Sequence, residues 1–189
     1  MDAYKDVAHL VTILMRHREP YDNHGTRVAQ MARRLAIAAQ LPTVDVHMVE
    51  MGAYLHDVGK LLLPDQLINT TRKLNTMERL QMQSHVKLGG EIVKEAGYHA
   101  IIQNIVLYHQ EKWDGSGYPF GLKENQIPLE AQLIAVCDVF EAMTNSRPYR
   151  ESNSIPFTRA YMESRSGLDF NPKLIDLFFT HVVTGEIYG

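Results

Sequence analysis

Six histidine and aspartate residues of this 189-residue chain are candidate ligands for divalent metal ions. Taken singly, each has a plainer explanation, because a lone histidine on an apolar helix stripe is more often a hydrogen-bonded core residue. An aspartate inside the apolar run LIAVCDVFEAM is harder to dismiss, since a buried, unpaired carboxylate is costly. Spread over five predicted helices, the six are better explained by one metal centre than by separate coincidences: His24, His56, Asp57, His85, His109 and Asp138.

The ligand types narrow the choice of metal. Nitrogen and carboxylate donors without a thiolate suit iron, manganese or zinc better than softer metals. More than four ligands indicates two ions, with Asp57 as the natural bridge between them. A helical bundle can bring such inward-facing groups together in its core.

The segment YHQEKWDGSGYPFGL, residues 108–122, follows one of these ligands. His109 is a candidate ligand, and Gln110 stands where a second ligand would be expected. Three glycines and a proline then predict a structured loop rather than a regular element. Trp113 is better interpreted as pinning this loop to the core than as a functional residue.

Helical periodicity runs through almost the whole chain, and no convincing alternating strand is found. Asn75 and Glu78 have the spacing of a capping box, Asp22 or Asn23 and Thr43 are candidate helix caps, and a short turn is expected at 64–68. No linker, repeat or low-complexity tract divides the chain. We therefore predict a single all-α domain over 1–189 with helices at 3–17, 23–41, 43–57, 75–94, 98–109, 128–145, 154–165 and 171–183.

Composition excludes several classes of protein. A formal net charge of −3 gives no general attraction to nucleic acid or anionic membranes. No apolar run approaches the roughly 18 to 20 residues needed to span a bilayer. The single cysteine, Cys137, favours a reducing compartment, and the N-terminal residues do not resemble a signal peptide. We expect a soluble cytoplasmic protein, or the soluble domain of one.

The order of these motifs resembles a known superfamily. His24, the HDVGK segment at 56–60, His85 and Asp138 resemble the HD phosphohydrolases, while HQEKWDGSGYPFGL and DVFEAMTNSRPYR resemble their HD-GYP branch. The resemblance implies an HD-domain helical bundle with a GYP loop and additional C-terminal helices. It also implies a metal-dependent phosphodiesterase that uses a hydroxide bridging two metals to convert cyclic di-GMP to pGpG, with GMP as a further product left open.

The resemblance also implies roles for individual residues. Lys60 is expected to contact the scissile phosphate and, with Asp57, to take part in catalysis; Tyr118, Arg147 and Arg150 are expected to bind substrate. The implied metal ligands form two sets that share Asp57: His24, His56, Asp57 and Asp138 for the first ion, and Asp57, His85 and His109 for the second.

The chain departs from the family pattern at two positions. The usual HHE reads His109-Gln110-Glu111, so a weak ligand or a supporting hydrogen bond is altered at Gln110. A glutamate that some members use for a third metal is replaced by Pro20. We expect two divalent ions, iron or manganese before zinc, with the second bound more weakly.

Two other functions stay open at this point. One is a weak or inactive HD-GYP module that binds cyclic di-GMP or a partner protein, and the other is an HD phosphohydrolase with a different nucleotide substrate. Diguanylate cyclase domains and an upstream sensory domain are candidate partners, whereas polymeric nucleic acid and membrane insertion are not expected. The sequence does not define the oligomeric state.

Overall fold

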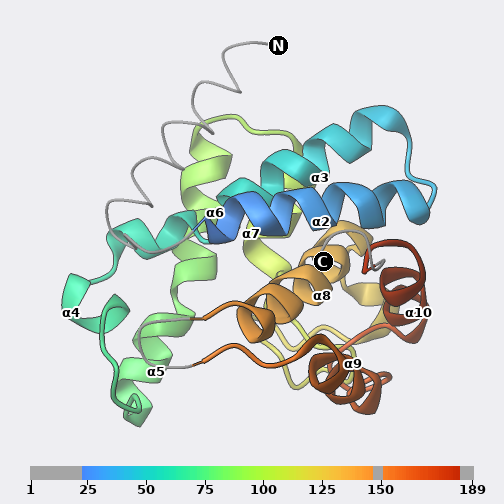
Figure 1. Ribbon diagram of the computed structural model, residues 1–189. Coiled ribbons are helices and arrows are strands. Elements are labelled where there is room, and N and C mark those ends of the chain that lie inside the picture. The colour runs from blue at the N-terminus through green and yellow to red at the C-terminus, as the bar shows by residue number, and fades with distance from the viewer. Residues whose placement is uncertain (1–22, 147–150, 184–189) are drawn as a thin grey trace.

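The computed structural model describes residues 23–146 and 151–183, and these residues form a helical bundle without a named strand (Figure 1). This confirms the predicted all-α class. The helix predicted at 3–17 lies outside the described residues, as do Arg147 and Arg150. No helix in the described ranges is long and apolar enough to cross a membrane.

The centre of the bundle is built from α2 (His24–Ala38), α3 (Thr43–Leu55), α7 (Ala100–Tyr108) and α8 (Leu129–Thr144). Helix α2 packs against both α3 and α8, and α3 packs against α7. The stripe predicted on α2 is buried as expected, with Val28 and Leu35 fully inaccessible and Met31 nearly so. Helices α9 (Ile155–Ser164) and α10 (Pro172–His181) complete the core beside α8 (Figure 1).

One predicted helix is wrong in its extent. The helix expected over 75–94 is two helices, α5 (Thr76–Gln83) and α6 (His85–Glu95), separated at Ser84. The Ser84 hydroxyl donates to the Gln81 carbonyl at 2.6 Å, a local bond that competes with continuation of the helix. The capping box of Asn75 and Glu78 is present as predicted.

Other element ends also differ from the predictions. The turn expected at 64–68 is a short helix, α4 (Asp65–Ile68), and Asn23 occupies an N-cap position without a side-chain capping bond. Thr43 is the first residue of α3 rather than its cap, because Pro42 takes the cap position. Helix α3 ends at Leu55, and the chain turns at His56 and Asp57 into the 3₁₀ helix η1 (Val58–Leu62), which packs on α6.

The loop after α7 is structured, as predicted, and contains a 3₁₀ turn, η2 (Glu124–Gln126). Backbone hydrogen bonds attach it to the turn between α9 and α10: Trp113 N–H donates to the Asp169 carbonyl and Asp114 N–H to the Leu168 carbonyl. The side chain of Asp169 adds a bidentate pair with Arg165 and contacts Lys112 at 3.1 Å. The C-terminal helices therefore anchor the loop that follows His109.

Candidate metal centre

The six predicted ligands come from five separate parts of the fold and meet in its interior. His24 begins α2, His56 and Asp57 form the junction of α3 and η1, His85 begins α6, His109 caps the end of α7, and Asp138 lies within α8. All are buried except Asp138, whose side chain is 19% exposed. Each lies at a helix end or faces inward, so distant segments contribute to one cluster.

Three of the histidines are held by backbone carbonyls three or four residues earlier in the chain. A carbonyl can only accept, so Nδ1 is the donor in each hydrogen bond, and Nε2 is the nitrogen left to bind a proton or a metal ion. This arrangement fixes the ring and leaves Nε2 directed into the cluster. The bonds join His56 Nδ1 to Ala53 O at 2.7 Å, His85 Nδ1 to Met82 O at 2.7 Å, and His109 Nδ1 to Ile105 O and Val106 O at 3.2 Å each.

The Nε2 atoms of the four histidines face one another in pairs. Nε2 of His24 lies 3.4 Å from Nε2 of His56, and Nε2 of His85 lies 3.4 Å from Nε2 of His109. Two lone pairs at this separation repel unless a proton or a cation lies between them. The arrangement therefore has the donor chemistry that a metal ion requires.

Asp57 lies between the two histidine pairs and divides its oxygens between them. Oδ2 is 3.3 Å from Nε2 of His56, whereas Oδ1 is 3.4 Å from Nε2 of His85 and 3.9 Å from Nε2 of His109. Two groups of potential ligands result, each with its donor atoms within 4.8 Å of one another: His24, His56 and Asp57, and Asp57, His85 and His109. The residues present thus fit two cations that share one carboxylate.

The two groups differ in electrostatic environment. Burial alone would lower the pKa of His24, but hydrogen bonds and charges of Asp138 and Glu141 raise that pKa to about 10. Burial, together with the charges of the nearby His56 and His85, lowers the pKa of His109 to about 3. The His24 group therefore carries the excess of negative charge, and a metal ion bound there must displace a proton.

The carboxylates of the centre are held in their charged form. Burial alone would raise the pKa of Asp57, but the positive charges of Lys60 and His56 hold it well below the usual range. Hydrogen bonding with His24 likewise lowers the pKa of Asp138 against the effect of burial. The Lys60 ammonium lies 2.7 Å from Asp57 Oδ2, and its side chain is 22% exposed, so it stands where the centre meets solvent.

Glu111, the third residue of the HQE segment, bonds to two backbone N–H groups of the Gly-rich loop. Glu111 is only 3% exposed, and its carboxylate accepts from the backbone N–H groups of Phe120 at 2.7 Å and Leu122 at 3.1 Å. The Gln110 carbonyl accepts from the Tyr118 N–H at 3.2 Å. The Tyr118 ring lies edge-on to His85, with centroids 6.4 Å apart, so the loop borders the second group of ligands.

Sequence reasoning missed two residues next to His24. Glu141 lies one helical turn after Asp138 and is 1% exposed, and Arg27 lies one turn after His24. Glu141 accepts a hydrogen bond from His24, and Arg27 donates one to Glu141. A signal was available, because Glu141 is a second carboxylate in the same apolar run.

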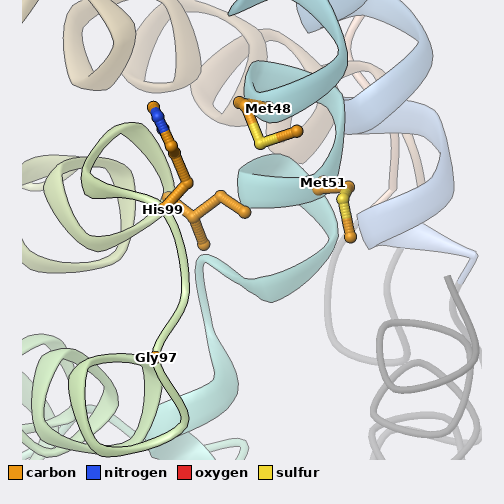
Figure 2. A pocket seen from close by; sticks show the side chains of 5 residues that line it. Met48, Met51, Gly97 and His99 are labelled. Carbon is orange, nitrogen blue, oxygen red and sulfur yellow. The ribbon is translucent and has the colours of Figure 1, made fainter. Parts of the chain in front are cut away.

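A separate pocket lies away from these residues, between α3 and the start of α7 (Figure 2). Met48 and Met51 of α3 face His99 across it, with Gly97 and Ile102 completing the lining. Within residues 23–146 and 151–183, no predicted site residue lines this pocket, and its lining holds no cluster of ionisable groups. It is therefore not the candidate site.

Comparison with known proteins adds a second line of observation. Residues 9–174 match the family described as HD domain. The chain is 37% identical over 152 residues to the cyclic di-GMP phosphodiesterase response regulator RpfG of Xanthomonas campestris, covering 79% of this chain and 40% of that protein. It is 35% identical over 160 residues to the 3'3'-cGAMP-specific phosphodiesterase 2 of Vibrio cholerae, covering 84% of this chain and 31% of that protein.

A solved structure shares the fold. The cyclic GMP-AMP specific phosphodiesterase structure from V. cholerae superposes with a TM-score of 0.69 at 17% sequence identity, over 92% of this chain and 48% of that one. The present chain spans less than half the length of each of these three proteins.

Proposed function

The chain belongs to the HD domain family, and on that premise we propose that it is a metal-dependent phosphodiesterase that hydrolyses cyclic di-GMP. This membership confirms the resemblance of the HDVGK motif to the HD superfamily, and the GSGYP motif supports the HD-GYP branch. The observation that carries the proposal is the placement of Asp57, whose two oxygens are divided between two inward-facing histidine pairs. Relatives named as cyclic dinucleotide phosphodiesterases support this choice of substrate class.

The proposed ligand sets are the two groups that share Asp57, with Asp138 added to the first because its Oδ1 lies 3.3 Å from Nε2 of His24. When bound, two divalent ions supply Lewis acidity that lowers the pKa of water and neutralises phosphate charge. Iron or manganese is the first choice and zinc the alternative, because the donors are imidazole and carboxylate. The second ion has one protein ligand fewer, and Gln110 adds no imidazole, so we propose that it is held more weakly.

Lys60 and Tyr118 are proposed to act on the substrate. The Lys60 ammonium, beside Asp57 and partly exposed, can donate a charge-assisted hydrogen bond to a phosphate oxygen and stabilise the charge that grows there. Burial raises the pKa of Tyr118, so its hydroxyl remains a donor at neutral pH. Arg147 and Arg150 are proposed from the family resemblance to grip phosphate or guanine with planar, multiple donors.

Two observations favour alternative functions. Gln110 in place of histidine favours a module that binds the dinucleotide with little or no turnover. The relative named as cGAMP-specific favours a different cyclic dinucleotide as substrate. Diguanylate cyclase domains, an upstream sensory domain and a cytoplasmic location stay predictions.

The proposal is tested by metal analysis of protein purified without chelator, combined with hydrolysis assays. Cyclic di-GMP and 3'3'-cGAMP are each supplied with Mn²⁺ or Fe²⁺ under anaerobic conditions, and linear products are separated by chromatography. Two bound ions and accumulation of pGpG from cyclic di-GMP are expected. Faster cleavage of 3'3'-cGAMP would reassign the substrate, and tight dinucleotide binding with no product under either metal would overturn the enzymatic proposal.

A further inference from the structure

Glu141 of α8 makes a continuous set of hydrogen bonds beside the centre. One oxygen, Oε2, accepts from His24 Nδ1 at 2.5 Å. The other, Oε1, accepts from Arg27 at Nε, 2.6 Å away, and contacts Nη2 at 2.5 Å. The carboxylate is 1% exposed and the His24 ring is buried, so the bond between them is shielded from solvent, whereas the Arg27 side chain is 35% exposed.

His24 is held differently from the other three histidines of the centre. The other three histidines donate Nδ1–H to carbonyls three or four residues earlier in the chain. The Nδ1 of His24 is instead bonded to a carboxylate of another helix. The carboxylate of Glu141 supplies from α8 what the backbone supplies elsewhere.

Arg27 determines which way Glu141 faces. It lies on α2, one turn from His24, so both partners of the carboxylate belong to the same helix. Because two guanidinium nitrogens occupy Oε1, Oε2 is left directed at His24. The ring is thereby oriented with Nε2 towards Asp138, 3.3 Å away, and His56, 3.4 Å away.

We propose that Glu141, held by Arg27, is the positioning residue of His24 and sets the affinity of the ion bound by His24, His56, Asp57 and Asp138. This inference rests on the proposed function, because it needs the cluster to bind metal. Outer carboxylates of this kind fix the ring orientation and raise the basicity of metal-ligating histidines, and their loss typically weakens metal binding about 10- to 100-fold. The ion at His85 and His109 does not depend on Glu141.

A purely structural role makes a different prediction. If Glu141 and Arg27 only tie α8 to α2, their loss lowers the stability of the whole bundle and affects both ions alike. The two roles are separated by measuring each half of the centre alone. His85→Ala leaves the His24 group intact, and His24→Ala leaves the His85 and His109 group intact.

The experiment introduces Glu141→Gln into both backgrounds and measures Mn²⁺ affinity by competition with a chelator. The substitution keeps the size of the side chain and one acceptor oxygen while removing the charge. In the His85→Ala background we expect about 10- to 100-fold weaker binding, and in the His24→Ala background no change. Glu130→Gln is the matched control, because Glu130 also lies on α8 and accepts a side-chain bond from another helix, that of Asn104 at 2.7 Å.

Arg27→Lys provides a second test if the glutamine variant folds poorly. Lysine keeps the positive charge but cannot place two nitrogens on one carboxylate oxygen. We therefore expect a smaller loss of Mn²⁺ affinity, confined to the His24 group. Equal losses in both backgrounds, or none in either, would overturn the inference while leaving the proposed function intact. Absence of any bound ion from the wild-type protein would overturn both.

Discussion

Replacing Gly59 with alanine tests how closely the centre depends on the contact between η1 and α6. Gly59 follows Asp57 by two residues and precedes Lys60, and it lies against the start of α6, where His85 is found. A Cβ atom at this position would lie 1.9 Å from the His85 carbonyl oxygen and 2.5 Å from the Gly89 nitrogen. Both obstacles are backbone atoms, so no side-chain rotation can relieve the clash.

The required displacement follows from these distances. Ordinary contact begins at 3.4 Å, so a Cβ at 1.9 Å demands that η1 and α6 separate by about 1.5 Å, the difference between the two. Overpacking of this kind costs about 3 kcal/mol of unfolding free energy, at the upper end of the usual range. Because Asp57 Oδ1 and His85 Nε2 are 3.4 Å apart across this contact, the same displacement would pull apart the proposed ligands of the second ion.

The assays are the free energy of unfolding by urea denaturation and the metal content after dialysis. We expect Gly59→Ala to be less stable, to lose the second ion and to lose hydrolysis. Gly97→Ala is the matched control: Gly97 has φ of +72° and nothing within 4 Å of the added Cβ, so alanine there strains the backbone without moving a ligand. A Gly59→Ala protein that retains both ions and wild-type stability would refute the reasoning.

Three further predictions concern the loop and the second ion. Glu111→Ala removes the acceptor of two loop N–H groups, so we expect a loss of about 2 kcal/mol in unfolding free energy and a raised KM for cyclic di-GMP, measured by denaturation and initial rates. Hydrogen bonding with Arg165 lowers the pKa of Asp169, so the charged carboxylate stabilises the fold above its unfolded pKa and this stabilisation is lost as the pH falls. Asp169→Asn should therefore be less stable than wild type by about 1 kcal/mol at pH 7, with a gap in urea denaturation that narrows below about pH 4; a constant gap would contradict the assignment. Gln110→His should tighten the second ion about 10-fold in chelator competition, and an unchanged affinity would show that this position does not reach the metal.

The convergence of the candidate ligands could be anticipated because their residue types require a partner when buried. Histidine on an apolar stripe, as at His24, and a carboxylate in an apolar run, as at Asp138, each require a partner, and one shared centre would provide it for both. The capping box at Asn75 was equally predictable, since its bonds join residues three positions apart. Local rules suffice for features of this kind.

Other features depend on contacts between distant segments. The bond of Glu141 to His24 joins residues 117 positions apart, and nothing in the local pattern pairs them. The approach of Gly59 to the carbonyl of His85 is likewise visible only once η1 packs on α6. The break at Ser84 escaped prediction because helical periodicity continues across it, while a single hydroxyl bond favours the turn.

The most direct test of the centre is the metal content of Asp57→Ala beside that of the wild-type protein. Both are purified without chelator, loaded with Mn²⁺ and analysed by mass spectrometry of the bound metal, with circular dichroism to verify folding. If Asp57 bridges two ions, the wild type carries two per chain and the folded variant loses both, together with hydrolysis of cyclic di-GMP. A folded Asp57→Ala protein with the metal content of the wild type would contradict the account.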